Sequence, residues 1–367
     1  MDAVYGLRRK KGSTYFIIVL VLLGFAVNGN YPNSFFASNG VRAQTQSPSV
    51  IMISSPTNIT QPGNYELAAD LSGTQSAGYC IGIFASNVVL NGIGHTLSGN
   101  GYGTGIYVSK SSDNVYIKNI NIQGYSSGIL INSSQGVSVA YSVLSYNNLG
   151  IYVYDSKNVS ILYDTANSNN NPDISIYGSQ NVSVTYGNFY DHNNNNIYNI
   201  YVTKSNYIIL SDNSITNNGG DGISLQYSNN SLIIKNNIVW TGGDGGNGDG
   251  LYLNYSYNDM LENNNITTVN CFWISGDGID IYYSNGSTLR NNFITNFPNN
   301  GIDIYYSTHT IIDYNTISYD GGFGVYLSGS NGIKLYNNFI ENNHQTSLYA
   351  YYSNNDSFIN NSISGNG

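Results

Sequence analysis

The sequence predicts an all-β fold, a parallel β-helix of about twelve stacked coils with about 23 residues each. The first observation is a repeated phrase: "GIDIYYS" occupies residues 278–284 and again residues 301–307. The second is that nine related segments fall into register with it, at intervals of 22 to 28 residues. The third is composition, because charged residues are only 9% of the 367 while Tyr numbers 35. A chain so poor in Lys and Glu and so rich in Tyr and Ile is typical of many short strands.

Each copy of the phrase alternates aliphatic and variable residues, which is the period of a β-strand with one buried face. All eleven copies end in Ser: Ser111, Ser134, Ser156, Ser179, Ser205, Ser228, Ser256, Ser284, Ser307, Ser330 and Ser353. A second apolar pattern follows in the same coil and carries an Asn column: Asn213, Asn237, Asn264, Asn292, Asn315, Asn338 and Asn361. Both columns are expected at the corners of stacked coils, where they pass hydrogen bonds from one coil to the next.

Three regions follow from this pattern: residues 1–43 as a signal peptide or N-terminal anchor with its linker, 44–80 as an N-terminal capping segment, and 81–367 as the β-helix. The first region carries Arg8-Arg9-Lys10-Lys11 before an apolar run and is typical of a secretory signal. Its removal leaves seven basic and twenty acidic residues, a net charge of −13. We therefore expect a secreted or cell-surface protein that does not bind nucleic acid.

Cys80 and Cys271 are the only two cysteines. Stacked coils about 4.8 Å apart would separate them by about seven coils, far beyond the reach of a disulfide. We therefore expect free thiols, or pairing only between chains.

The entry segment "ITQPGNYELAADL", followed by "YCIGIFASNVVLNGIGHTLSG", resembles the capping strand and first coil of the pectate-lyase-like superfamily, and within it of the NosD-like surface and periplasmic proteins. The resemblance implies a right-handed β-helix over about residues 48–367. NosD-like proteins are described as copper-binding. The four histidines here lie on well-separated coils, so the residues do not favour a metal: His95, His192, His309 and His344.

Lyases of this superfamily use an Arg or Lys base with carboxylate-bound calcium, and its hydrolases use adjacent Asp residues and a Gly-His-Gly motif. The Gly-His-Gly motif and adjacent Asp residues are absent from this sequence. The only Arg beyond residue 43 is Arg290, and it stands in a column of alternating charge with Lys235, Glu262 and Asp313. Such a column is self-neutralising, which favours a structural role for Arg290.

The strongest candidate for chemistry is a group of aspartates. Asp280 and Asp303 hold the same variable position of two adjacent coils, and Asp221, Asp249 and Asp277 form a second column just before each coil start. Catalytic candidates are Asp277, Asp280 and Asp303, at a spacing that suits a retaining glycosidase. Sugar-binding candidates combine carboxylates with aromatic rings: Trp240, Asp249, Trp273, Tyr283 and Tyr306. The same carboxylates would suit a Ca²⁺ ion. An ordinary acidic surface with Asp-Gly turns explains the pattern equally.

Two functional hypotheses remain from the sequence. The first is a structural or adhesive protein that binds polysaccharide or a cell-surface glycan without catalysis, with no cofactor. The alternative is a polysaccharide lyase or glycoside hydrolase acting at the long loops of residues 240–250 and 268–278. The last coil carries no capping pattern after "NNSISGNG". We therefore also expect head-to-tail self-association through its open strand edges.

Overall fold

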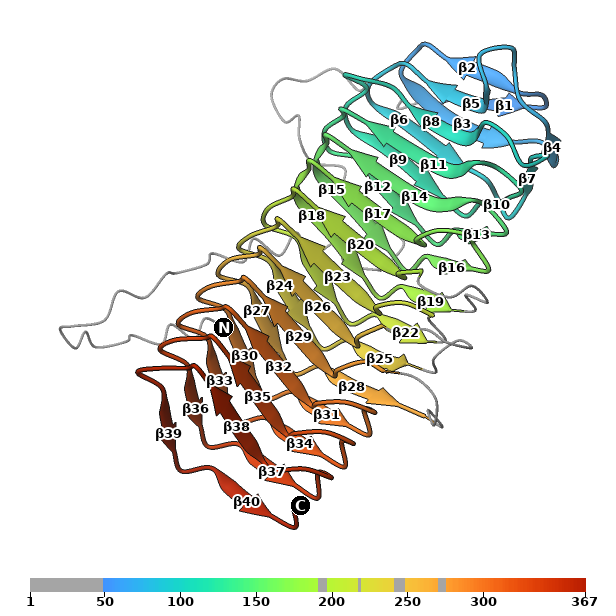
Figure 1. Cartoon of the computed structure of the whole chain (residues 1–367). Coiled ribbons are helices and arrows are strands. Elements are labelled where there is room, and N and C mark those ends of the chain that lie inside the picture. Colours follow the sequence, from blue (N-terminus) through green and yellow to red (C-terminus); the bar gives the residue numbers. More distant parts are fainter. Residues whose placement is uncertain (1–48, 191–196, 217–218, 241–247, 270–274) are drawn as a thin grey trace, which may run out of the picture. The chain divides into compact units, whose positions relative to one another are not determined.

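The computed structural model describes residues 49–367 except 191–196, 217–218, 241–247 and 270–274. The described residues form strands and no helix. The strands build three parallel sheets, and each sheet takes one strand from every turn of a solenoid (Figure 1). The predicted all-β solenoid is therefore confirmed.

The first sheet contains fourteen strands: β1 Val50–Ile53, β3 Gly63–Leu67, β6 Val88–Asn91, β9 Val115–Lys118, β12 Ser138–Ala140, β15 Lys157–Leu162, β18 Gln180–Thr185, β21 Ile209–Ser211, β24 Leu232–Ile234, β27 Met260–Glu262, β30 Thr288–Arg290, β33 Ile311–Asp313, β36 Lys334–Tyr336 and β39 Ser357–Ile359. The second contains thirteen: β4 Leu71–Ser72, β7 Thr96–Ser98, β10 Asn121–Gln123, β13 Val143–Ser145, β16 Thr165–Asn167, β19 Asn188–Tyr190, β22 Ser214–Thr216, β25 Asn237–Trp240, β28 Asn265–Thr268, β31 Phe293–Thr295, β34 Thr316–Ser318, β37 Phe339–Glu341 and β40 Ser362–Ser364.

The third sheet, on which the repeated phrase lies, also contains thirteen: β2 Thr57–Ile59, β5 Tyr79–Ile83, β8 Thr104–Val108, β11 Ser127–Asn132, β14 Leu149–Tyr154, β17 Ile174–Tyr177, β20 Ile200–Thr203, β23 Ile223–Gln226, β26 Leu251–Asn254, β29 Ile279–Tyr282, β32 Ile302–Tyr305, β35 Val325–Ser328 and β38 Leu348–Tyr351. The segment expected to cap the fold supplies β1 to β4 and the start of β5, so the turns number about thirteen.

The core is a column of aliphatic side chains that runs along the inside of the solenoid. Ile279 and Ile281 of β29 are completely buried, and they pair in register with Ile302 and Ile304 of β32. Each of these Ile side chains rests on an aliphatic side chain from the turn before and another from the turn after, because Leu251 pairs with Ile279 and Val325 with Ile302. This repetition explains why the aliphatic positions of the phrase recur at each turn.

The Ser column forms a hydrogen-bond ladder, as expected. The backbone N of Ser284 donates to Oγ of Ser307 at 2.9 Å, and both residues are fully buried. The Asn column works in the same way at another corner. The backbone N of Asn292 donates to Oδ1 of Asn315 at 2.9 Å, and Nδ2 of Asn292 donates to the carbonyl of Leu261 at 2.8 Å. The side chain of each ladder Asn thus satisfies two backbone groups of the turn before it, one N–H and one carbonyl.

Three residues stand one position away from where the sequence pattern places them. Ser111 is exposed, and Ser112 takes the buried position of its turn. Asn236, rather than Asn237, accepts the backbone N of Asn213. Lys235 lies outside the charge column, because the residue in register with Glu262 is Ile234. In each case one residue more or less at a corner shifts the alignment without breaking the ladder.

Cys80 is buried and free, and Cys271 lies outside the described residues. Nowhere in the described ranges does a helix long and apolar enough to span a membrane occur.

Candidate functional site

The aspartates singled out from the sequence gather on the outer side of the third sheet. In register, Ser224 of β23 pairs with Tyr252 of β26, Tyr252 with Asp280 of β29, and Asp280 with Asp303 of β32. Paired residues of neighbouring strands lie about 4.8 Å apart and point to the same side of the sheet. The predicted juxtaposition of Asp280 and Asp303 is confirmed.

A second column of carboxyl groups runs beside the first, just before the strands begin. Oδ1 of Asp221 accepts the backbone N of Asp249 at 3.0 Å, and Oδ1 of Asp249 accepts that of Asp277 at 2.7 Å. Oδ1 of Asp277 accepts the backbone N of Asn300 at 2.7 Å. One oxygen of each of these three aspartates therefore serves the ladder between turns. We call the outer side of β23, β26, β29 and β32 with these five aspartates the acidic face.

Burial raises the pKa of every carboxyl group on the acidic face, and neighbouring carboxylates add to the rise at Asp249, Asp280 and Asp303. Burial raises the pKa of Asp221 to about 7 and that of Asp277 to about 6. Burial, followed by the charge of Asp277, raises the pKa of Asp303 to about 7. The pKa values of Asp249 and Asp280 lie well above the usual range, because burial is reinforced by neighbouring carboxylates. Near neutral pH the face therefore holds protons that ordinary surface aspartates have lost.

Trp240 does not serve as a sugar platform in this structure. Its side chain is completely buried, its ring stacks with Phe297 at a centroid distance of 6.4 Å, and Nε1 donates to the carbonyl of Gly220 at 2.9 Å. This correction to the sequence-based expectation has a simple cause: Trp240 ends β25 at an inward position and fills the core between turns. Trp273, the other predicted platform, lies outside the described residues.

Tyrosines border the acidic face where the strands of the third sheet end, and we call the following four the tyrosine row: Tyr227, Tyr255, Tyr283 and Tyr306. The rings stack on one another at centroid distances of 5.1 to 5.2 Å. The far side of Tyr306 is covered by Gly329, because a Cβ built on that glycine would meet the ring at 2.6 Å. Tyr283 and Tyr306 thus offer ring edges and hydroxyl groups to a ligand, and not the stacking faces that the sequence suggested.

The donor set does not fit a copper or calcium site. Within the described ranges, no three His, Cys, Asp or Glu side chains are placed to hold one metal ion. His95 contacts Asp70 at 3.0 Å, far from His309 and His344, and His192 lies outside the described residues. The carboxyl groups of the acidic face are spread along four turns rather than converging on one point. We therefore derive no chemistry from a bound metal.

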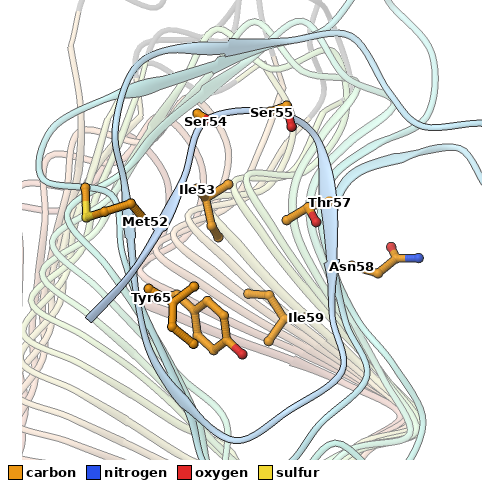
Figure 2. A pocket seen from close by; sticks show the side chains of 9 residues that line it. Met52, Ile53, Ser54, Ser55, Thr57, Asn58, Ile59 and Tyr65 are labelled. Carbon is orange, nitrogen blue, oxygen red and sulfur yellow. The ribbon is translucent and has the colours of Figure 1, made fainter. Parts of the chain in front are cut away.

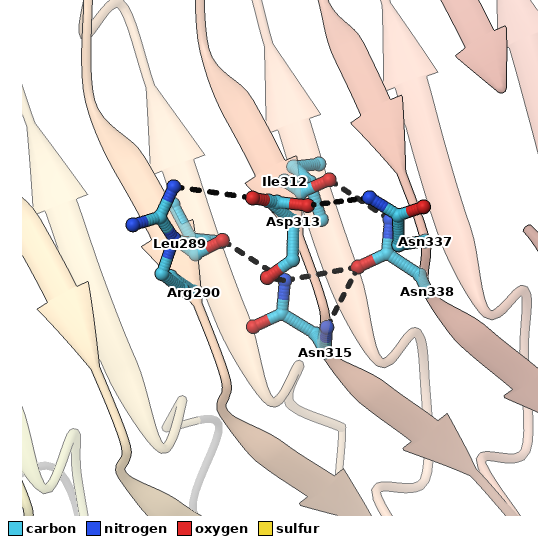
Figure 3. Close-up of polar contacts among 7 residues, drawn as sticks. All are labelled: Leu289, Arg290, Ile312, Asp313, Asn315, Asn337 and Asn338. Atoms are coloured by element: carbon cyan, nitrogen blue, oxygen red, sulfur yellow. Dashed lines mark hydrogen bonds and ion pairs between the residues drawn. The ribbon is translucent and has the colours of Figure 1, made fainter. Parts of the chain in front are cut away.

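Two other features lie away from the acidic face. Figure 3 shows Arg290 on the first sheet, where Nη2 contacts Oδ2 of Asp313 at 3.2 Å, as the charge column predicted. The other oxygen of Asp313 accepts Nδ2 of Asn337 at 3.2 Å, so the pair belongs to a surface ladder. Figure 2 shows a cavity of about 280 Å³ at the first turn, lined by Met52, Tyr65 and other residues of β1 to β3, with no charged side chain.

Two family models match the sequence. The model described as "Right handed beta helix region" matches residues 188–309 and 234–367, and the model "Periplasmic copper-binding protein (NosD)" matches residues 84–246. With the three parallel sheets, these matches define the class: the chain is a right-handed parallel β-helix protein. Within that class, residues 84–246 carry the NosD-like pattern. No curated protein matches the sequence.

Solved structures share the fold at low sequence identity. The periplasmic alginate epimerase AlgG is 15% identical, with a TM-score of 0.53 over 83% of this chain and 77% of that chain. Tailspike protein 3 of bacteriophage CBA120 is 12% identical, with a TM-score of 0.59 over 85% of this chain and 55% of that chain. The enzymatically active domain of tailspike protein 2 from the same phage is 16% identical, with a TM-score of 0.54 over 70% and 44%. At these identities the similarity demonstrates the architecture alone.

Proposed function

We propose that this protein is an extracytoplasmic polysaccharide-binding protein that holds a glycan on the acidic face without cleaving it. The observation that carries the proposal is a flat, rigid face on which half-buried carboxyl groups border tyrosine hydroxyls. Sugars are bound through dense hydrogen bonding, and both groups provide it. Two comparisons support the proposal: an alginate epimerase shares the fold, and the NosD model is named for periplasmic proteins.

A rigid scaffold favours binding. Each strand of the acidic face is held by parallel pairing on both sides and by the Ser ladder beneath it. A glycan that docks there needs little reordering of the protein, so little binding free energy is lost to conformational entropy.

The proposal is tested by affinity electrophoresis of the full chain through gels that contain single polysaccharides, both neutral and charged. We expect retardation on at least one polysaccharide. When Tyr283 and Tyr306 are both replaced by Ser, the apparent Kd from the retardation should rise by about tenfold or more. Two hydrogen-bonding ring edges are lost, and each contributes about 1 kcal/mol of binding free energy. A matched control is Tyr141→Ser with Tyr163→Ser, which removes another stacked pair from a different corner. Equal weakening in both variants would contradict the assignment to the acidic face.

The second candidate function is glycoside hydrolysis by Asp280 and Asp303. Their register places them at about 5 Å, the carboxyl separation of retaining enzymes. Such an enzyme needs one ionised nucleophile beside one protonated acid, yet the pKa values of both groups are raised. Binding is therefore favoured over cleavage. New reducing ends in polysaccharide digests that disappear with Asp303→Asn would reverse this preference.

A further inference from the structure

The strands of the acidic face give its five carboxyl groups no positive partner. The strands β23, β26, β29 and β32 contain no Lys, Arg or His. Arg290, the nearest Arg in sequence, lies on the first sheet and pairs with Asp313. Lys204, one turn before Tyr227, directs Nζ toward the hydroxyl of Tyr177 on the preceding turn at 3.2 Å. No cation on these strands therefore compensates the five carboxyl groups of the face, and near neutral pH they retain protons instead.

Several polar atoms of this face are buried and still lack a hydrogen-bond partner. The Ser224 side chain is completely buried, although it lies on the outer side of its strand, and its Oγ has no partner. Oδ1 of Asp303 and Oδ1 of Asn254 are likewise buried and unpartnered. A buried oxygen acceptor without a donor destabilises the fold, so these atoms mark places where a donor is missing. A ligand that brings N–H groups would satisfy them.

The carboxyl groups form rows along the solenoid rather than a cluster around one point. Asp221, Asp249 and Asp277 succeed one another on consecutive turns, and Asp280 and Asp303 run beside them. A row with steps of about 4.8 Å suits a polymer that repeats a charged group, whereas a single metal ion needs convergent ligands. The tyrosine row runs in the same direction, about three residues or about 10 Å farther along each strand.

We infer that the ligand of the acidic face is a polysaccharide with free amino groups, a cationic amino-sugar polymer. This inference rests on the proposed polysaccharide binding and names the class of sugar. An ammonium group beside these carboxyl groups would favour their ionised form, so that they release protons on binding, and it would donate up to three hydrogen bonds to the resulting carboxylate oxygens. A uronic acid polymer would bring further carboxylates to a face whose own five carboxyl groups already lack a cation, and it would oppose their ionisation. The proposed polymer therefore carries positive charge, whereas alginate carries negative charge.

The test is calorimetric titration of the full chain at pH 6.5 with three hexasaccharides: β-1,4-linked glucosamine, its neutral glucose counterpart, and mannuronate. We expect the glucosamine hexamer to bind at least tenfold more tightly than the glucose hexamer, with affinity that falls as salt rises. Mannuronate should bind most weakly. Equal or tighter binding of the glucose hexamer or of mannuronate overturns the amino-sugar class and leaves polysaccharide binding intact. Failure of every oligosaccharide in the titrations and of every polysaccharide in the gels overturns both proposals.

Two sets of variants distinguish the effect of the carboxyl groups on binding from any effect on folding. Asp280→Asn with Asp303→Asn keeps the shape of both side chains and removes two groups that can ionise beside a bound ammonium group, so the glucosamine hexamer should lose at least tenfold in affinity. Binding of the glucose hexamer should change by less than threefold. The matched control is Glu341→Gln on β37 of the second sheet, which removes a charge far from the face and should leave both affinities unchanged. An unaltered glucosamine affinity in the double variant, with its circular dichroism intact, would refute the inference.

Discussion

Buried aspartates in the Asn ladder predict a solenoid that is most stable in acid. Oδ1 of Asp164 accepts the backbone N of Ser142, the same contact that the ladder Asn residues make on other turns. Ladder Asn residues also donate through Nδ2, as Asn213 does to the carbonyl of Val184 at 2.9 Å. Oδ2 of Asp164 occupies the equivalent position, is buried, and has no donor of its own unless it carries a proton. A protonated Asp164 would therefore reproduce the hydrogen bonds of Asn.

The magnitude follows from the pKa. Burial raises the pKa of Asp164 from 3.8 to about 8. The native state therefore holds a proton that the unfolded chain releases above pH 4, so stability is full below that pH and is lost as pH rises through 8. Each pH unit in this window costs about 1.4 kcal/mol, which amounts to about 5 kcal/mol for this one group between pH 4 and 8.

The assay is urea unfolding, followed by circular dichroism, at pH 4 and pH 8 for the natural chain and for Asp164→Asn. The variant keeps the backbone contact and restores a permanent Nδ2 donor. We expect it to match the natural chain within about 1 kcal/mol at pH 4 and to exceed it by up to about 5 kcal/mol at pH 8. Asp113→Asn, which removes a half-exposed carboxylate near the same end of the solenoid, serves as the control. A variant that is less stable than the natural chain at pH 8 would refute the neutral-acid reasoning.

Further substitutions test the core and the ladders by the same urea unfolding. Ile281→Asp places a charge inside the aliphatic column and should destabilise its turns by several kcal/mol, with loss of the cooperative transition; a natural midpoint would contradict the core assignment. Trp240→Ala should cost about 3–5 kcal/mol, because a large buried ring is removed; a variant with natural stability and weakened glycan retardation would instead favour a binding role. Arg290→Ala should cost only about 0.2–1 kcal/mol, since its side chain is 46% exposed, and a larger loss would show that the surface ladder matters more than this exposure implies.

The architecture could be predicted from the sequence because each turn of the solenoid needs the same kinds of residue at the same positions. A buried Ile or a ladder Ser must recur wherever the coil returns, so the pattern reports three-dimensional neighbours directly. The positions of Ser111, Asn237 and Lys235 were predicted one residue off because corners do not follow this strict repetition. Corners accept one extra residue without breaking the ladder. Aligning the repeats by sequence therefore does not reveal which of two adjacent residues points inward.

The site was harder to predict because burial on the outer side of a strand depends on distant neighbours. Ser224 occupies a position that alternation assigns to solvent, yet it is completely buried. The faces of Tyr283 are covered by the rings on the turns before and after it. A tryptophan in a long coil suggests a sugar-binding platform. The interior of this coil instead accommodates the Trp240 ring, which is buried in the core. Position along the strand was predictable, and accessibility was not.

The column of Asp221, Asp249 and Asp277 continues with an uncharged residue, which shows what the column requires of a side chain. Asn300 continues it and accepts the backbone N of Phe323 at 2.9 Å, so a neutral amide performs the same structural task on the next turn. Burial raises the pKa of Asp277 to about 6, and the ionised carboxylate therefore weakens the fold above that pH. Asp277→Asn should raise the unfolding midpoint at pH 8 and weaken binding of the glucosamine hexamer. Such opposite effects on stability and binding are expected where a charged group serves a ligand rather than the fold. A loss of stability with unchanged binding would assign the carboxylate to the architecture instead.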